Sequence, residues 1–345
     1  MAAGARWAEL AATVRAADAV VAVGARTHAD IGGPVVKATE VTVPAGIVAF
    51  EPADMTATVD AGTTCAELAH ALAQAGQECP LDPRDPQATV GGTVACGLSG
   101  PRRLGLGPLR NQLLEVTFVT ADGRVVRGGG PTVKNVTGYD IPRLFTGSLG
   151  TLGVLVQVIL RTQPIATASQ WYRHAGDPSD LVGSLPGART IRWDGATTDV
   201  LLEGHATDLD AQMQALNLEP TEPDAPTALP DGPHRGRISV EPNQIRALAT
   251  ELRGVGVRWA AEVGVGTVHV SAHDPAALGE AREAATRCGG WLLREAGAPD
   301  LDPFGVAFPA AEVQRRLRIA LDPTGKLSPG RVPATAPVTP VGAIA

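Results

Sequence analysis

Two glycine-rich stretches decide the fold of this chain. Residues 87–107 read QATVGGTVACGLSGPRRLGLG, and residues 146–160 read TGSLGTLGVLVQVIL. Glycine lacks a Cβ atom, so its backbone reaches positive φ and can approach a ligand closely. Successive backbone N–H groups in such a turn form a concave site for anions. Two stretches of this kind in one domain predict a large phosphate-bearing cofactor that lies along the backbone.

The spacing of these glycines does not fit a nicotinamide-binding fingerprint. That motif requires a strand, then G-x-G-x-x-G and then a helix, with an acidic residue about 20 positions later. After the apolar run at 20–23 only Gly24 is in place, and Gly91-Gly92 has no third glycine at the right offset. The simpler interpretation is that the glycines form ordinary tight turns. It is less favoured here, because two clusters occur together with a distinctive flanking sequence.

The flanking motifs occur in a fixed order along the chain. They read GQECPLDP at 76–83, ATVGGTVA at 88–95, LSGPRR at 98–103, VKNVTGYD at 133–140, GSLGTLG at 147–153 and DPTGKLSPGR at 322–331. In this order they resemble the vanillyl-alcohol oxidase/p-cresol methylhydroxylase (PCMH) superfamily of FAD-binding proteins, and within it the branch of FAD-binding (E) subunits of glycolate oxidase. The resemblance is strong over roughly residues 18–165 and moderate over 300–333, and the combined set is far more specific than any one glycine pair.

The resemblance implies an α+β fold with four parts. We expect a two-part PCMH-type FAD-binding domain at 1–165 and a small α+β cap or substrate domain at 166–300. A C-terminal segment at 301–333 is expected to return to the FAD domain, and 334–345 to form a flexible tail.

The resemblance also implies where FAD binds. Residues 24–28 occupy the place of the family's pyrophosphate loop, but Ala25 and Arg26 stand where relatives have glycine, which allows weaker binding. Arg26 could add a charge-assisted contact. His28 aligns with a position that forms no bond to flavin, so we expect non-covalent FAD. The implied cofactor-binding residues are Gly24, Ala25, Arg26, Thr27, His28, Pro80, Asp82, Thr89, Val90, Gly91, Gly92, Ser99, Gly153 and Val154. Tyr139 and Asp140 either line the flavin pocket or support the fold.

The implied function is FAD-dependent oxidation of a 2-hydroxy acid such as glycolate or D-lactate, with hydride passing to the flavin. The implied partners are a larger FAD-containing catalytic subunit and an iron–sulfur subunit. Such chemistry needs a base for the hydroxyl proton, and the sequence identifies none. Two alternatives therefore stay open. The chain is either a non-catalytic subunit that holds FAD, or a structural remnant without cofactor, which the changes at Ala25 and Arg26 would permit.

Metal sites are not predicted. The four cysteines form no CxxC pair, which argues against an iron–sulfur or zinc site in this chain. His269 and His273 lie on one predicted strand about 13 Å apart, with no evident acidic partner. Arg294 and Arg331 have the bidentate geometry that suits a carboxylate, but arginines are common and we assign neither.

Composition limits the remaining classes. The net charge is −7 and no polybasic run occurs, which argues against a nucleic-acid partner. The hydrophobic fraction of 44% supplies a sizeable core. No apolar run reaches the ~20 residues of a membrane span, and the N-terminus does not read as a signal peptide. We expect a cytoplasmic protein, peripheral at the inner face of the membrane through its partners.

Periodicity and capping signals predict the main elements. Helices are expected at 5–17, at 65–75 with Thr64 and Glu67 as a capping box, at 275–288 and at 309–321. Strands are expected at 20–23 and 154–160, with a hairpin turn at 121–123. Residues 217–235 read as a loop.

Overall fold

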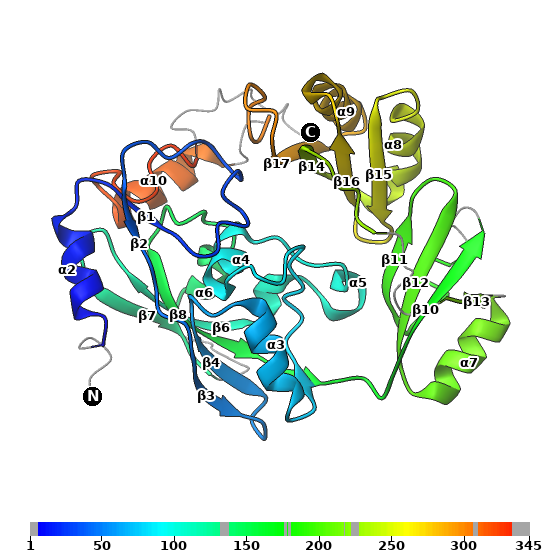
Figure 1. Ribbon diagram of the computed structural model, residues 1–345, viewed down its shortest axis with the longest axis horizontal. Coiled ribbons are helices and arrows are strands. Elements are labelled where there is room, and N and C mark those ends of the chain that lie inside the picture. The colour runs from blue at the N-terminus through cyan, green and yellow to red at the C-terminus, as the bar shows by residue number, and fades with distance from the viewer. Residues whose placement is uncertain are drawn as a thin grey trace. The chain divides into compact units, whose positions relative to one another are not determined.

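The computed structural model describes residues 6–131, 138–175, 178, 181–216, 218–221, 228–305 and 310–332. Helices and sheets are mixed in both parts of the chain, which confirms the α+β class. The chain divides into two compact units (Figure 1). Unit 1 comprises Met1–Leu98, Leu109–Gln163 and Val306–Ala345, and unit 2 comprises Ser99–Pro108 and Pro164–Gly305. Residues 99–108, which the sequence placed with the first domain, thus cluster with the second unit, and the four-part functional division stays a prediction.

The main sheet of unit 1 has five antiparallel strands. Their order is β3-β4-β8-β6-β7, with bounds Ile47–Glu51, Thr56–Asp60, Val154–Arg161, Leu113–Val119 and Val125–Gly129. β6 and β7 form the hairpin expected around residues 121–123, and Gly123 there has a φ of 77°. The short strands β5 (Gln77–Glu78) and β9 (Gln163–Pro164) form a separate two-stranded sheet.

Both faces of this sheet are buried, which explains why β8 reads as a continuous apolar run. Val154 and Val156 pack in one core cluster with helix α2 (Ala8–Ala16). Leu155 belongs to a second cluster, which contains side chains from the helices α3 (Cys65–Ala73), α4 (Val90–Cys96) and α6 (Ile141–Phe145). Side chains of successive strand residues point to opposite faces, so a strand covered on both sides needs apolar residues throughout.

The predicted capping signals are confirmed in unit 1. The Thr64 side chain accepts a hydrogen bond from the Glu67 amide, and the Glu67 carboxylate accepts one from the Thr64 amide at 2.9 Å. This is the reciprocal arrangement that satisfies two unpaired N–H groups at the start of a helix. Helix α3 begins at Cys65 as expected and ends at Ala73, two residues before the predicted end.

The described C-terminal residues from helix α10 (Ala311–Leu321) onward belong to unit 1. After this helix the chain runs beside β1 (Val20–Ala22), which also pairs in parallel with β2 (Thr39–Val41). The Val20 amide donates to the Lys326 carbonyl at 2.8 Å, and the Ser328 amide donates to the Val20 carbonyl at 2.7 Å. Leu327 is buried in the same core cluster as Val20. Residues more than 300 positions apart in sequence therefore share one small core.

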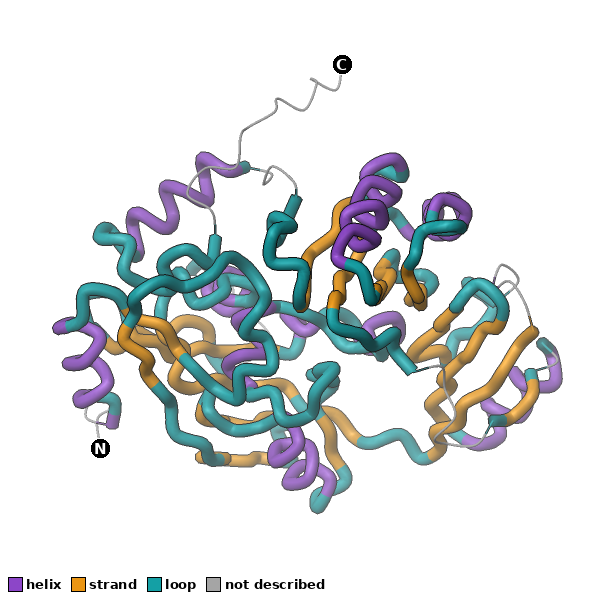
Figure 2. Tube along the Cα trace, turned by 45° about the horizontal axis from the view of Figure 1, so that its top comes forward, coloured by secondary structure: helices purple, strands orange, loops and turns teal. Residues whose placement is uncertain are grey.

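Unit 2 is built on an eight-stranded antiparallel sheet. The strand order is β13-β10-β12-β11-β15-β16-β14-β17, with bounds Glu219–Pro220, Ala168–Ala175, Thr197–Gly204, Ala188–Trp193, Val257–Glu262, Thr267–Ala272, His234–Ser239 and Trp291–Ala296. Helices α7 (Ala206–Ala215), α8 (Ile245–Glu251) and α9 (Pro275–Arg287) pack against it (Figure 2). The prediction for α9 is confirmed, including proline in its first turn. The predicted loop at 217–235 is partly wrong, because β13 and the start of β14 fall within it.

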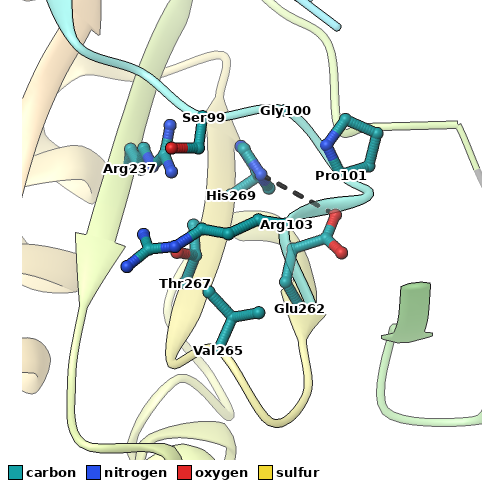
Figure 3. A pocket seen from close by; sticks show the side chains of 9 residues that line it. All are labelled: Ser99, Gly100, Pro101, Arg103, Arg237, Glu262, Val265, Thr267 and His269. Carbon is teal, nitrogen blue, oxygen red and sulfur yellow. Dashed lines mark ion pairs between the residues drawn. The ribbon is translucent and has the colours of Figure 1, made fainter. Parts of the chain in front are cut away.

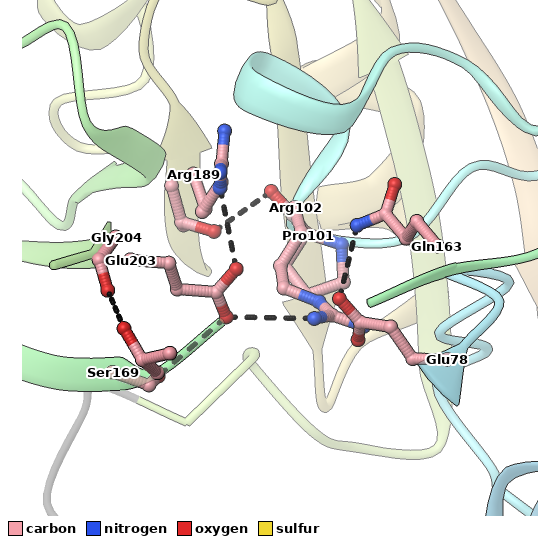
Figure 4. A network of polar contacts seen from close by, with 10 residues as sticks. Glu78, Pro101, Arg102, Gln163, Ser169, Arg189, Glu203 and Gly204 are labelled. Carbon is pink, nitrogen blue, oxygen red and sulfur yellow. Dashed lines mark hydrogen bonds and ion pairs between the residues drawn. The ribbon is translucent and has the colours of Figure 1, made fainter. Parts of the chain in front are cut away.

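Segment 99–108 is held to unit 2 by a buried carboxylate. Glu203 on β12 pairs with Arg102 at 3.4 Å and with Arg189 on β11 at 3.2 Å (Figure 4). The Thr190 hydroxyl adds a hydrogen bond to the Pro101 carbonyl at 2.9 Å. The side chain of Glu203 is only 8% exposed, and two guanidinium groups compensate the cost of burying it.

Candidate functional site

The loop that follows β1 presents unused backbone donors. Within the described part of the chain, none of the amides from Gly24 to His28 donates a hydrogen bond, whereas Val23 donates to Val41 on one side and Ala29 donates to Arg26 on the other. Gly24, Ala25 and Arg26 are exposed, while Thr27 and His28 are half-buried. Consecutive N–H groups without protein acceptors are available to bind the oxygens of an anion such as phosphate.

Arg26 adopts a left-handed backbone conformation that favours glycine. Its φ is 59°, in the left-handed region where a side chain costs about 1 kcal/mol or more. Its guanidinium pairs with Glu40 at 2.5 Å, and both side chains are more than half exposed. An exposed ion pair of this kind contributes little to stability. To make the predicted contact with a phosphate, Arg26 would therefore have to give up only its weak ion pair with Glu40.

His28 lies at the end of this loop in a partly buried environment. Burial lowers its pKa from the ordinary histidine value, and Asp85 opposes that shift. One ring nitrogen, Nδ1, is 3.0 Å from the Thr27 hydroxyl. The imidazole is thus favoured in its neutral form and is tied to its neighbour.

Arg331 binds the backbone just after this loop. The sequence did not indicate this role. Its Nη1 donates to the carbonyls of Ala29 at 2.6 Å and Ile31 at 3.0 Å. The Gly33 amide donates back to the Arg331 carbonyl at 2.9 Å. Burial lowers the pKa of this guanidinium, with Cys96 and Asp30 opposing the shift. Arg331 is therefore a support for the candidate phosphate loop, and its guanidinium is already engaged by protein carbonyls.

Thr89 joins the two predicted cofactor-binding segments. It is the N-cap of α4, and its hydroxyl accepts a hydrogen bond from the Gly92 amide at 3.2 Å. A Cβ placed on Gly24 would lie 2.7 Å from the Thr89 Cγ2 atom, so residue 24 must be glycine for the loop to pass here. The structure therefore brings the pyrophosphate-loop position and the GG motif into contact within unit 1.

The two glycines of the GG motif have different surroundings. Gly91 is buried, its amide donates to the Ala61 carbonyl at 2.8 Å, and a Cβ there would lie 2.7 Å from the Ala61 Cβ. Gly92 is half-exposed, and a Cβ there would meet only the Thr89 Oγ1, at 3.0 Å. Val90 is fully buried, and its amide donates to the Thr63 carbonyl. Gly91 thus serves the packing of α4, whereas the space beside Gly92 is open except for Thr89, and its contact with the cofactor stays a prediction.

The other predicted cofactor-binding residues of unit 1 are mostly interior. Pro80 is buried, and Asp82 is half-buried with a φ of 42°. Gly153 makes room for the tilted pair of Phe118 and Phe145 rings, whose centroids are 4.2 Å apart. The core position of Val154 is described above, and contact of any of these residues with the cofactor stays a prediction. The VKNVT part of the VKNVTGYD motif lies outside the described residues, as does the tail at 334–345.

Tyr139 and Asp140, at the end of that motif, are described. Tyr139 is 90% exposed, and the Asp140 side chain caps helix α6 by accepting from the Arg143 amide at 3.0 Å. Asp140 thus supports the fold, the second of the two roles considered for it.

Ser99 falls in unit 2, where it lines a small pocket (Figure 3). The Nε2 atom of His269 lies 4.0 Å from a Glu262 carboxylate oxygen. Glu262 also accepts hydrogen bonds from Arg192 at 3.2 Å. Arg294 donates to the Gly297 carbonyl at 2.9 Å. The pocket is lined by Ser99, Gly100, Pro101, Arg103, Arg237, Glu262, Val265, Thr267 and His269.

Among the described residues, no group of three or more His, Cys, Asp or Glu side chains has the geometry to hold a metal ion. No described helix is both long and apolar enough to cross a membrane.

Part of this chain is similar in sequence to a known protein family and to several known proteins. Residues 2–129 match the family described as FAD binding domain. The chain is 40% identical over 149 residues to the glycolate oxidase subunit GlcE of Escherichia coli, covering 42% of this chain and 43% of that protein. It is 40% identical over 104 residues to a D-lactate dehydrogenase of Archaeoglobus fulgidus, covering 30% of this chain and 24% of that protein. The chain thus spans less than half of the length of these curated relatives.

Another glycolate oxidase subunit and a solved structure are also similar to this chain. The glycolate oxidase subunit GlcD of Bacillus subtilis is 34% identical over 119 residues, covering 34% of this chain and 25% of that protein. A solved alkyldihydroxyacetonephosphate synthase superposes with a TM-score of 0.68 at 15% identity, covering 93% of this chain and 74% of that chain. At this identity the likeness shows the fold alone.

Proposed function

We propose that this chain, which carries an FAD binding domain in residues 2–129, is an FAD-binding subunit of a glycolate oxidase-like enzyme that oxidises 2-hydroxy acids. The names of the similar proteins support the substrate class, since they include glycolate oxidase subunits and D-lactate dehydrogenases. The observation that carries the proposal is the run of unused amides from Gly24 to His28 beside Thr89.

The residues present fit the phosphate-bearing part of FAD. The loop amides would bind the phosphate oxygens, and Arg331 would hold the chain just after the loop by binding the carbonyls of Ala29 and Ile31. The open backbone of Gly92 would allow the cofactor to approach. When bound, FAD supplies the acceptor for the hydride that leaves the substrate. The protein holds the cofactor through fixed backbone donors, which need no reorganisation when the charge binds.

Neither the catalytic base nor catalysis by this chain alone is assigned. The second candidate function is therefore a subunit that holds FAD without oxidising substrate itself. We propose that the chain works in the cytoplasm within a hetero-oligomer with a larger FAD-containing subunit and an iron–sulfur subunit. Similarity to both GlcE and GlcD supports a multi-subunit assembly.

The deciding experiment is an absorption spectrum of the purified full chain, followed by acid precipitation. Non-covalent FAD gives a yellow protein whose flavin moves to the supernatant. Flavin in the pellet would overturn the non-covalent assignment, and a colourless protein that takes up no added FAD would favour the structural remnant. Bleaching by added glycolate then separates a catalytic subunit from one that only holds FAD.

A further inference from the structure

One C-terminal segment, residues 326–331, holds the candidate phosphate loop at both of its ends, and we call this segment the strap. At the entry to the loop, the strap runs parallel to β1 and exchanges two backbone hydrogen bonds with Val20. At the exit, Arg331 binds the two carbonyls that follow the loop. Because no amide from 24 to 28 donates a hydrogen bond to a described residue, the position of the loop depends on where its two ends are placed.

Lys326 anchors the strap to the C-terminal end of helix α2. Its Nζ atom donates hydrogen bonds of 3.1 Å to the carbonyls of Arg15 and Ala17, which lie in the last turn and at the C-cap of that helix. Carbonyls at a helix C-terminus lack partners within the helix and carry partial negative charge, so a cation is favoured there. Lys326 is only 9% exposed, and the two carbonyls offset the cost of burying its ammonium group. The Lys326 carbonyl accepts from the Val20 amide, so the anchor lies at the entry to the loop.

Helix α2 is itself attached to the main sheet of unit 1. Its buried residues Ala11 and Val14 pack in one core cluster with residues of β8. The Arg15 guanidinium donates to the carbonyls of Asp122 at 3.1 Å and Gly123 at 3.2 Å, in the turn between β6 and β7. The ammonium group of Lys326 therefore connects the strap to the core of the sheet.

We propose that Lys326 is a positioning residue for the cofactor, and that it acts through the strap on the candidate phosphate loop. A loop that samples several conformations binds its ligand with an affinity reduced by the fraction of molecules in the competent conformation. Fixed ends raise that fraction, because less conformational freedom remains to be lost when the ligand binds. The effect on FAD rests on the proposed function, whereas the connection from Lys326 to the loop rests on the contacts of this chain alone.

FAD affinity of the full chain tests the positioning role, measured by flavin fluorescence titration in the wild type and in Lys326→Met. The titration is done at a temperature where near-UV circular dichroism shows both proteins fully folded, so that a loss of stability alone leaves the affinity unchanged. We expect Lys326→Met to bind FAD about tenfold more weakly, which corresponds to a fall of the competent fraction to about a tenth. Lys37→Met is the matched control, because Lys37 is an exposed lysine of the same unit, and it should keep the wild-type affinity.

Amide hydrogen exchange of the FAD-free proteins gives a second readout, which does not depend on the cofactor. The strap accepts hydrogen bonds from the amides of Val20, before the loop, and Gly33, after it. Both amides should exchange faster in Lys326→Met than in the wild type, because local opening of the strap exposes them. If Lys326 only stabilises the end of α2, the Ala17 amide exchanges faster while Gly33 keeps its wild-type rate.

Wild-type FAD affinity in folded Lys326→Met would contradict the proposal, and so would an unchanged exchange rate at Gly33. If the wild type itself takes up no FAD, the proposed function fails, and the exchange rate at Gly33 still decides whether Lys326 positions the loop. If Lys326→Met does not fold, Lys326→Gln takes its place under the same criteria, since its side-chain amide keeps an N–H donor.

Discussion

The side chain of Thr89, through both its hydroxyl and its methyl group, occupies the space that a side chain at position 24 would need. The Thr89 Cγ2 atom lies 2.7 Å from the point where a Cβ on Gly24 would stand, although the two residues are 65 positions apart in sequence. The same threonine caps α4 through the Gly92 amide. Thr89 therefore lies between the candidate phosphate loop and the GG motif and contacts both.

Gly24→Ala should displace the loop and weaken FAD binding at least tenfold. The added methyl group overlaps with Thr89, and overpacking of this kind costs about 1–3 kcal/mol. FAD affinity is measured by flavin fluorescence titration, and stability by urea denaturation. Gly279→Ala is the matched control, since its Cβ would meet only Leu301, at 3.9 Å, within helix α9. That variant should keep its FAD affinity and gain about 0.5–1 kcal/mol of stability. Unchanged FAD affinity in Gly24→Ala would show that the loop does not bind the cofactor.

Substitution of the two adjacent glycines should have opposite consequences. Gly92→Val should give a folded protein that lacks FAD, because the new side chain meets only Thr89 and fills the ligand's space. Gly91→Val should lower the melting temperature strongly, because its side chain overlaps with Ala61. Circular dichroism melting and flavin absorbance distinguish the two outcomes. Full flavin occupancy in a folded Gly92→Val variant would leave the GG motif with a structural role alone, as the first turn of helix α4.

Arg331→Met should reduce both stability and FAD affinity. The variant loses charge-assisted hydrogen bonds to the carbonyls of Ala29 and Ile31, with an expected cost of about 2 kcal/mol. Arg331→Lys should be intermediate, because an ammonium group lacks the planar fork of arginine. Arg124→Met, at a 72% exposed side chain of unit 1, is the control and should be neutral. If Arg331→Met keeps wild-type FAD affinity, the loop is held by other contacts.

Cys65 should make the protein less stable at alkaline pH. Burial raises the pKa of this thiol from its ordinary value to about 11, with the Thr93 hydroxyl opposing and Asp82 reinforcing the shift. The folded state therefore keeps a proton that the unfolded state releases, so stability falls as pH rises from about 9 to 11. At about pH 10 the loss is about 1 kcal/mol relative to neutral pH. Urea denaturation at both pH values should show this loss in the wild type beyond that in Cys65→Ala. An equal alkaline loss in both proteins would contradict the buried-thiol assignment.

Local signals predicted most of the secondary structure of unit 1. The capping box at Thr64 and Glu67, the hairpin around Ala121-Asp122-Gly123 and the apolar run of β8 each depend on residues within one element and its neighbours. Capping and turn formation are decided by the backbone within a few positions. For the same reason α9, with proline in its first turn and Gly289 after its end, was recognisable from sequence.

The sequence determined the cofactor class and the elements that frame its site, because ordered glycine motifs limit the local backbone directly. Tertiary structure alone decided how these motifs are used. It separated Gly91, which packs on Ala61, from Gly92, which stays open, and it placed Arg331 under a loop about 300 residues earlier. It also assigned Ser99 to unit 2, and it paired Arg237 with His269 on neighbouring strands. Such relationships depend on which distant segments come together, and no local pattern of residues encodes the partner of a buried charge.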